Sequence, residues 1–199
     1  KVETLAPAAI TERDGAWRVD MGRNFTGWLE VDLRNGKAGQ VVKFKTANRP
    51  EETLEFDQES HYIHDESGKG VFCHRFNYMA GRWITIEGLT YTPAAKDIRC
   101  YSITNDRKRI GSFECSKKLF NDIYETDLRT YLASTVNGVL MDCPHRERYG
   151  YGEVAFACAW GCGIPNYESA AFYAKVIRDW CDVQGEDGCV NTIAPQVYK

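Results

Sequence analysis

Residue types that can do chemistry are most concentrated in residues 141–153, which read MDCPHRERYGYGE. This stretch holds three carboxylates, Asp142, Glu147 and Glu153, spaced five and six positions apart. No hydrophobic period runs through it, which argues against an ordinary helix or strand. The proline favours an extended backbone before it, and the two glycines suit a turn or a close backbone approach. We therefore expect an irregular loop on which the three acids could converge.

Two interpretations of this loop are open from its composition. A loop rich in charges and aromatic rings is typical of a functional site. A solvated loop with an internal ion pair has the same composition, because Glu147 stands between Arg146 and Arg148. Such a surface pair contributes under about 1 kcal/mol. A neighbouring guanidinium would also lower the pKa of Glu147.

Several stretches of the chain resemble one protein family. Residues 142–150, DCPHRERYG, resemble the signature loop of the bacterial α-L-rhamnosidase family of glycoside hydrolases. Upstream, residues 20–28, DMGRNFTGW, and residues 111–116, GSFECS, are similar to further family segments. Downstream, residues 179–188 and the Ala-Pro pair at 194–195 resemble its next helix and loop. Four motifs in the right order are more specific than any one of them.

The resemblance implies a role for each charged residue of the loop. The family's general acid corresponds to Glu147, and its sugar-binding aspartate corresponds to Asp142. Arg146 matches the family's arginine, whose planar guanidinium suits hydroxyl recognition. Glu153 stands near a position that is usually Asp, with an offset of one residue left open, and its longer side chain leaves its role undecided. The family's general base is a Glu that would lie beyond Lys199.

Glycoside hydrolysis explains why carboxyl groups matter here. An inverting enzyme, which is what the resemblance implies, holds two carboxyl groups roughly 6.5–9.5 Å apart with a water between them. Its general acid stays protonated through burial or a neighbouring negative charge. Tyr151 and Trp160 could stack on a sugar face, and core packing is the equal alternative for Trp160. The resemblance implies no metal and no cofactor, and without a base we expect residues 1–199 alone to have little hydrolase activity.

Period-two alternation predicts strands from residue 16 to about residue 102. Apolar residues at 29, 31 and 33 alternate with charged ones, and residues 42–45 and 84–87 repeat the pattern. Asn35-Gly36 predicts a hairpin turn after the first of these strands, and residues 61–70 are polar enough for a loop. Short strands with Gly and Asn between them indicate an antiparallel β-sandwich.

The pattern changes to helical spacing after a charged linker at residues 105–109. Ser116 is a candidate N-cap for a helix that we expect to end at Asn137-Gly138. Residues 154–162 predict a short buried helix, and Asn166 is a candidate cap for the next one. We divide the chain into a β-sandwich at residues 1–106 and helices at residues 107–199. The resemblance implies that these helices begin an (α/α)₆ toroid.

Composition excludes several classes of function. The chain has 25 basic and 28 acidic residues, a net charge of −3, which argues against nucleic-acid binding. No apolar run approaches the length of a membrane span. The eight cysteines include no C-x-x-C pair, so we expect mostly reduced thiols and no structural metal. The oligomeric state is left open, and a periplasmic or extracellular location is favoured over the cytoplasm.

Two functions from different classes fit these observations. The first is a glycoside hydrolase that releases terminal α-L-rhamnose or a similar sugar. The alternative is a carbohydrate-binding β-sandwich without catalysis, in which Trp28, Trp83 and Tyr91 would form a stacking platform. The acid loop discriminates between them, because a pure binding module has no use for Asp142 and Glu147.

Overall fold

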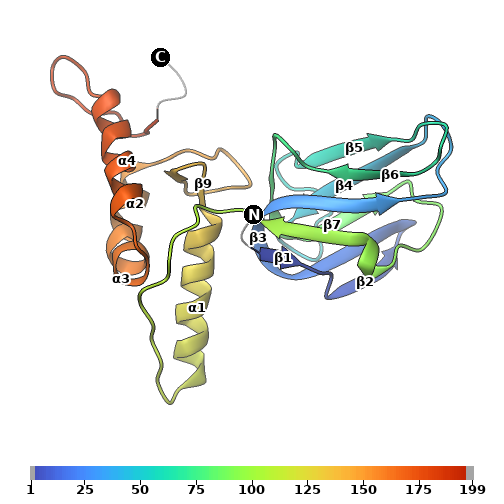
Figure 1. Cartoon of the computed structure of the whole chain (residues 1–199), viewed down its shortest axis with the longest axis horizontal. Helices are drawn as coiled ribbons and strands as arrows, with labels where there is room; N and C mark the ends of the chain where they lie inside the picture. The colour runs from blue at the N-terminus through green and yellow to red at the C-terminus, as the bar shows by residue number, and fades with distance from the viewer. Residues whose placement is uncertain (1–2, 196–199) are drawn as a thin grey trace. The chain divides into compact units, whose positions relative to one another are not determined.

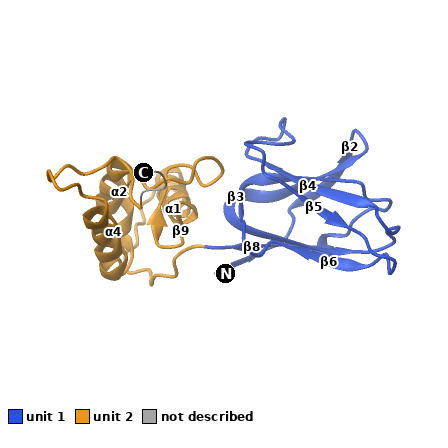
Figure 2. Ribbon diagram, turned by 90° about the horizontal axis from the view of Figure 1, so that it is seen from above, with its two compact units in different colours: residues 1–103 blue, residues 104–199 orange. Residues whose placement is uncertain are grey.

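The computed structural model describes residues 3–195, and the chain divides into two compact units. Unit 1 spans residues 1–103 and unit 2 spans residues 104–199. Figure 1 shows strands in the first unit and helices in the second, and Figure 2 colours the two units separately. An antiparallel sheet-rich part followed by helices is the predicted fold class, which is confirmed. The domain boundary that we predict after residue 106 stays a proposal, and the compact units of the structure meet after residue 103.

Unit 1 is built around one long strand that belongs to both layers of a sandwich. Its strands are β1 (Glu3–Leu5), β2 (Ala9–Arg13), β3 (Ala16–Leu33), β4 (Val41–Ala47), β5 (Glu59–Ile63), β6 (Gly70–Cys73), β7 (Met79–Glu87) and β8 (Ile98–Ser102). The first half of β3 lies between β2 and β7, and β4 and β5 continue that layer. The second half of β3 lies between β8 and β6, and β1 pairs with β8. Figure 2 shows these two layers.

The change of layer occurs where the register of β3 against β7 shifts, between Asp20 and Phe25. Gly22 has a φ of +79°, which glycine adopts without strain. Its backbone N–H donates to the Asp20 Oδ1 at 2.7 Å. Farther along β3, a Cβ on Gly27 would lie 1.9 Å from the carbonyl oxygen of Tyr101. The motif at residues 20–28 therefore fixes how β3 bends and packs against its neighbouring strands.

The core of unit 1 follows the predicted alternation. Leu29, Val31 and Leu33 are buried, whereas the residues between them are only partly buried. Phe44 and Phe72 stack at 4.3 Å between ring centroids and join β4 to β6. The buried apolar cluster of this unit consists of Leu5, Val19, Met21, Phe25, Leu29, Val31, Leu33, Val42, Phe44, Met79, Ile84, Ile86, Ile98 and Cys100.

Two predictions about the connections of unit 1 are wrong. Asn35 does adopt a left-handed φ of 56°, but β3 and β4 do not pair, because β7 lies between them in the sheet. The turn at Asn35-Gly36 therefore leads into a crossover instead of a hairpin. Residues 61–70 are not all loop either, since β5 extends to Ile63 and pairs with β4. Tertiary pairing overrides the polar composition of β5.

Unit 2 places two long helices around a small aromatic core. Its elements are α1 (Lys118–Ala133), β9 (Thr135–Val136), β10 (Val139–Leu140), α2 (Gly152–Cys158), the π-helical segment η2 (Ala159–Gly163), α3 (Ile164–Asn166) and α4 (Ala170–Asp182). The buried cluster consists of Leu128, Tyr131, Leu140, Tyr167 and Phe172. Arg107, in the charged linker, places its guanidinium over the rings of Tyr131, Tyr167 and Phe172, at 4.9, 5.5 and 4.4 Å. The linker is thus fixed to the helical core by cation–π contacts.

Several helix boundaries differ from the prediction. Lys117, not Ser116, is the residue before α1, and α1 ends at Ala133. Asn137-Gly138 instead forms the turn of the β9–β10 hairpin, with both φ angles positive. The helix predicted at residues 154–162 runs on through Pro165 and is buried on one side only, since Ala159 is 8% exposed and Phe156 is 70% exposed.

The predicted cap at Asn166 is also wrong. This residue is buried at the end of α3, and its amide donates to the carbonyl oxygen of Cys162 at 3.0 Å. Ser169 precedes α4 instead. Among the described residues, we find no helix that is both apolar enough and long enough to cross a lipid bilayer.

Candidate active site

The acid-rich loop begins directly after β10 and is held at its base by buried residues. Leu140 and Met141 are 2% and 3% exposed, and the Met141 N–H donates to the carbonyl oxygen of Ser134 at 2.9 Å. The carbonyl oxygen of Cys143 then accepts from the N–H groups of Arg146 and Arg148, at 3.1 and 3.3 Å. These bonds close a tight turn.

Arg148 marks local strain in this turn. Its φ is 61°, a left-handed conformation that costs free energy for a residue with a Cβ. Its Nε donates to the carbonyl oxygen of Pro144 at 3.0 Å. The side chain of Arg148 thus stabilises the turn in which its own backbone is strained. Backbone strain of this kind is often found at functional sites.

A distant segment supports the other end of the loop. The carbonyl oxygen of Gly150 accepts from the N–H of Ala194 at 3.0 Å, and the Gly152 N–H donates to the Thr192 carbonyl at 3.3 Å. Tyr151 and Ile193 form an antiparallel bridge between these bonds. A Cβ on Gly150 would lie 2.4 Å from the Ala194 carbonyl oxygen, so this position requires glycine. The two glycines are the sequence signal for this support, because they suit a close backbone approach, but they do not reveal which segment approaches.

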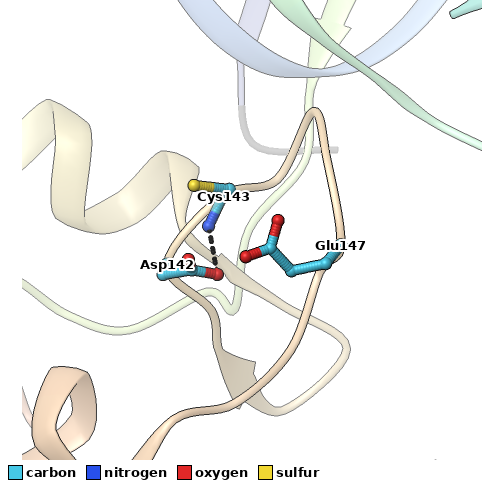
Figure 3. Close-up of side chains that lie close together, drawn as sticks. All are labelled: Asp142, Cys143 and Glu147. Carbon is cyan, nitrogen blue, oxygen red and sulfur yellow. Dashed lines mark hydrogen bonds between the residues drawn. The ribbon is translucent and has the colours of Figure 1, made fainter. Parts of the chain in front are cut away.

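The structure brings Asp142, Cys143 and Glu147 together (Figure 3). One carboxylate oxygen of each acid and the thiol sulfur lie within 4.8 Å of one another. The Glu147 carboxyl group points toward Asp142, whose Oδ1 accepts from the Cys143 N–H at 2.7 Å. Two carboxyl groups predicted from the motif are therefore neighbours, and the thiol of Cys143 lies beside them.

The guanidinium of Arg146 binds all three of these groups. Its Nη2 donates to Glu147 Oε1 at 2.9 Å, and its Nε donates to Glu147 Oε2, which makes the pair bidentate. The same Nη2 lies 3.5 Å from Asp142 Oδ2 and 3.2 Å from the sulfur of Cys143. Asp142, Cys143 and Glu147 could offer ligands to a cation, but Arg146 already supplies positive charge to them. We assign no metal to this cluster.

These contacts perturb the acid–base properties of the loop. Hydrogen bonding from Arg146 holds the pKa of Glu147 below its usual value, against the opposing effect of burial. Burial, with a hydrogen bond to Asp142, raises the pKa of the Cys143 thiol. Burial and the charges of Glu147 and Asp142 raise the pKa of Tyr151. The loop is thus a group of interacting side chains in which one arginine favours the ionised form of Glu147.

The other predicted site residues lie nearby in sequence but outside this cluster. Tyr151 is partly buried at the end of the loop, and its ring centroid is 6.2 Å from that of Tyr149. Glu153 is exposed in the first turn of α2, and Trp160, in η2, is 65% exposed. Among the described residues, neither Glu153 nor Trp160 makes a hydrogen bond or ion pair with the Asp142–Arg146–Glu147 group.

Comparison with known protein families places both units. Residues 10–104 match the model of the bacterial α-L-rhamnosidase concanavalin-like domain. Residues 108–199 match the model of the bacterial α-L-rhamnosidase six-hairpin glycosidase domain. The chain belongs to the bacterial α-L-rhamnosidase family. The resemblance noted in the sequence is confirmed, and the helices of unit 2 are the beginning of this family's helical domain.

Relatives of this rhamnosidase-family chain are longer. An α-L-rhamnosidase of Formosa agariphila is 31% identical over 180 residues, which cover 83% of this chain and 18% of the relative. The structure of an α-L-rhamnosidase from Dictyoglumus thermophilum matches with a TM-score of 0.89 and 26% identity, covering 98% of this chain and 23% of that one. The chain thus spans about a fifth of the length of these relatives.

A further structural match shows the fold alone. The α-L-rhamnosidase of Streptomyces avermitilis, solved in complex with L-rhamnose, matches with a TM-score of 0.88 at 22% identity. The match covers 99% of this chain and 20% of that one. At this identity the likeness assigns no residue role.

Proposed function

We propose that the protein carrying this chain is a glycoside hydrolase that releases terminal α-L-rhamnose, or a similar sugar, with Glu147 as its general acid. The observation that carries the proposal is the Asp142–Arg146–Glu147 cluster on a strained, braced loop. The family supports the reaction class, since its relatives include α-L-rhamnosidases from several organisms. The substrate is therefore a carbohydrate, and the reaction needs neither a redox step nor a cofactor.

The proposed reaction is the hydrolysis of a glycosidic bond. As the bond between the anomeric carbon and the leaving oxygen breaks, the Glu147 carboxyl group transfers its proton to that oxygen. A water attacks the anomeric carbon and gives up a proton to a base. Asp142 and Arg146 bind sugar hydroxyl groups, while Tyr151 and Trp160 offer aromatic faces to the apolar side of the ring. Glu153, at the start of α2, would contact more distant hydroxyl groups.

The separation of the two carboxyl groups bears on the stereochemistry. Asp142 and Glu147 offer oxygens within 4.8 Å of each other. An inverting pair needs roughly 6.5–9.5 Å to hold a water between its members. Asp142 is thus too close to serve as the inverting base opposite Glu147. We keep inversion as the proposed outcome and assign the base to a residue outside the 199 residues of this chain.

The test separates proton donation from substrate binding. In the full-length enzyme, Glu147→Gln keeps the shape and removes the transferable proton. It should lower kcat by about 10²–10⁴-fold on alkyl rhamnosides. Aryl rhamnosides with an acidic leaving group need no proton and should lose far less. Equal losses on both substrate classes would show that Glu147 is not the acid.

The binding-module alternative is disfavoured by the contacts of its aromatic residues. Trp83 already lies against two guanidinium groups, those of Arg18 at 5.4 Å and Arg82 at 5.2 Å. Tyr91 lies against the guanidinium of Arg34 at 4.7 Å. Two of the three rings proposed for a sugar platform therefore have a face in contact with arginine.

A further inference from the structure

Glu147 poses a problem as a general acid in the geometry described above. An acid that protonates a leaving group must carry a proton at the start of the step. The bidentate contact with Arg146 instead favours the ionised carboxylate. A change at Arg146 must therefore precede proton transfer from Glu147.

The geometry shows which side chain is able to move. The side chain of Arg146 is 47% exposed, whereas those of Asp142 and Glu147 are 22% and 21% exposed. The guanidinium contacts both acids from the end of a long flexible side chain, and its five donors also suit sugar hydroxyl groups. A bound sugar competes for those donors more easily than it displaces either carboxyl group.

Loss of Arg146 would reverse the electrostatics of the pair. Asp142 and Glu147 would then be two close acids without a shared cation, and such a pair retains a proton. The thiol of Cys143 and the ring of Tyr151 lie beside them, and Glu153 adds a further negative charge near Tyr151. The thiol and the phenol carry no charge and Glu153 is negative, so none of these three neighbours replaces the positive charge of the guanidinium once it has moved.

We propose that Arg146 is a positioning residue that keeps Glu147 ionised until sugar hydroxyl groups take over its guanidinium, and that Glu147 then takes up one proton from solvent. This proton is the one that passes to the leaving oxygen. The inference rests on the proposed function. It adds that Glu147 is ionised before substrate binds and becomes protonated when substrate binds.

Isothermal titration of the full-length enzyme with L-rhamnose, at about pH 5.5, measures this proton directly. The same titration is run in buffers of different ionisation enthalpy. The slope of the observed heat against that enthalpy gives the protons taken up per sugar bound. We expect a slope approaching one proton for the native enzyme and near zero for Glu147→Gln.

Each result has a distinct meaning. Absence of rhamnose binding in every buffer would overturn the proposed function and the inference with it. Binding without any buffer dependence would overturn the inference and leave the proposed function standing. Equal uptake in Glu147→Gln would also overturn it, because the proton would then go to another group.

The pH dependence of the rate provides a second readout. The alkaline limb of kcat/KM reports the free enzyme and that of kcat reports the complex. We expect the kcat limb to lie about 1–3 pH units higher, which is the usual effect of losing a close opposite charge. Arg146→Gln should raise the kcat/KM limb toward the kcat limb.

A matched control separates this effect from general damage. Arg109→Gln removes another bidentate Arg–Glu pair, the one with Glu125, and should leave both limbs in place. If Arg146→Gln lowers the rate equally at every pH without moving a limb, Arg146 has only a structural or binding role and the inference fails.

Discussion

At the scale of single residues, the loop shows how far a motif predicts chemistry. The sequence places Asp142, Arg146 and Glu147 close along the chain, and the structure gathers them around one guanidinium. The sequence alone could not decide whether Arg146 binds Glu147 or faces away from it. The direction of the Arg146 side chain depends on the turn closed by the Cys143 carbonyl oxygen. Nor could the sequence predict the contact of Gly150 with Ala194, which joins positions 44 residues apart.

The Cys143 thiol should react slowly with alkylating reagents. Burial and Asp142 raise its pKa, so the thiolate forms only above the pH at which an ordinary cysteine ionises. Cys181 and Cys189 are exposed and should be alkylated first by iodoacetamide at about pH 8. Peptide mass spectrometry after timed labelling measures the order. Labelling of Cys143 ahead of both exposed thiols would contradict the described environment.

His74 should make the stability of unit 1 depend on pH. Burial lowers its pKa from 6.5 to about 4, while its Nδ1 accepts from the Leu29 N–H at 3.1 Å. Between these values the unfolded chain binds a proton that the folded chain does not, so stability is complete above pH 6.5 and declines toward pH 4. The loss should reach about 3 kcal/mol or less.

Urea denaturation of residues 1–103 across this range measures the effect of His74. His74→Gln should remove most of the decline between pH 6.5 and 4. His61→Gln serves as the control, because His61 is an exposed histidine of the same unit. A decline that is unchanged in His74→Gln would assign it to other groups, such as Asp20, whose pKa is lowered by its hydrogen bonds from Arg82.

At the scale of secondary-structure elements, identical turn signals had different outcomes. Asn-Gly at positions 137–138 closes the β9–β10 hairpin, whereas Asn-Gly at positions 35–36 leads β3 away from its sequence neighbour. Local chemistry fixes the left-handed turn in both places. It does not fix which strand pairs next, because β4 gains more by packing against β7 and β5. Alternation of apolar and polar residues therefore predicted where the strands lie in the sequence, but not which strands are neighbours in the sheet.

The π-helical segment η2 offers a test of close packing. A Cβ on Gly163 would lie 2.3 Å from the Tyr173 hydroxyl oxygen and 2.6 Å from that of Tyr131. Gly163→Ala should therefore destabilise unit 2 by about 1–3 kcal/mol. Gly161→Ala, in the same segment, meets nothing within 4 Å and should be neutral or slightly stabilising.

Urea denaturation followed by far-UV circular dichroism gives the two free energies of unfolding. The difference between the variants is the informative quantity, since both replace a glycine of η2 by alanine. Equal stability of the two variants would show that the tyrosine hydroxyl groups move aside without cost.

At the scale of the whole molecule, the two units differ in how many apolar side chains they bury. The buried apolar cluster of unit 1 has fourteen members, whereas that of unit 2 has five. Both units leave large apolar side chains more than half exposed, and in unit 2 these include Ile110, Leu119, Phe120, Phe156, Trp160 and Ile177. Their exposure in unit 2 fits a chain that spans about a fifth of its relatives.

Residues 104–199 expressed alone should therefore bind the dye anilinonaphthalene sulfonate and associate with themselves, because exposed apolar patches favour both. Residues 1–103 should bind less dye and associate less, because their buried apolar cluster is the larger one. Dye fluorescence and analytical ultracentrifugation on the two pieces measure the difference. A monomeric, dye-negative helical piece would show that its apolar side chains are covered in solution.

The strand β3, which is shared by both layers, also limits how early unit 1 can fold while the chain is being synthesised. β3 finds β2 at once, but its partners β7 and β8 follow only after residue 78, and β1 must wait for β8, where Leu5 pairs with Cys100. The first layer cannot be completed on the ribosome before β7 has emerged, and the second layer must wait for β8, the last strand of the unit. Such long-range pairing folds slowly, and until then the nascent chain carries its longest apolar strand without most of its neighbours.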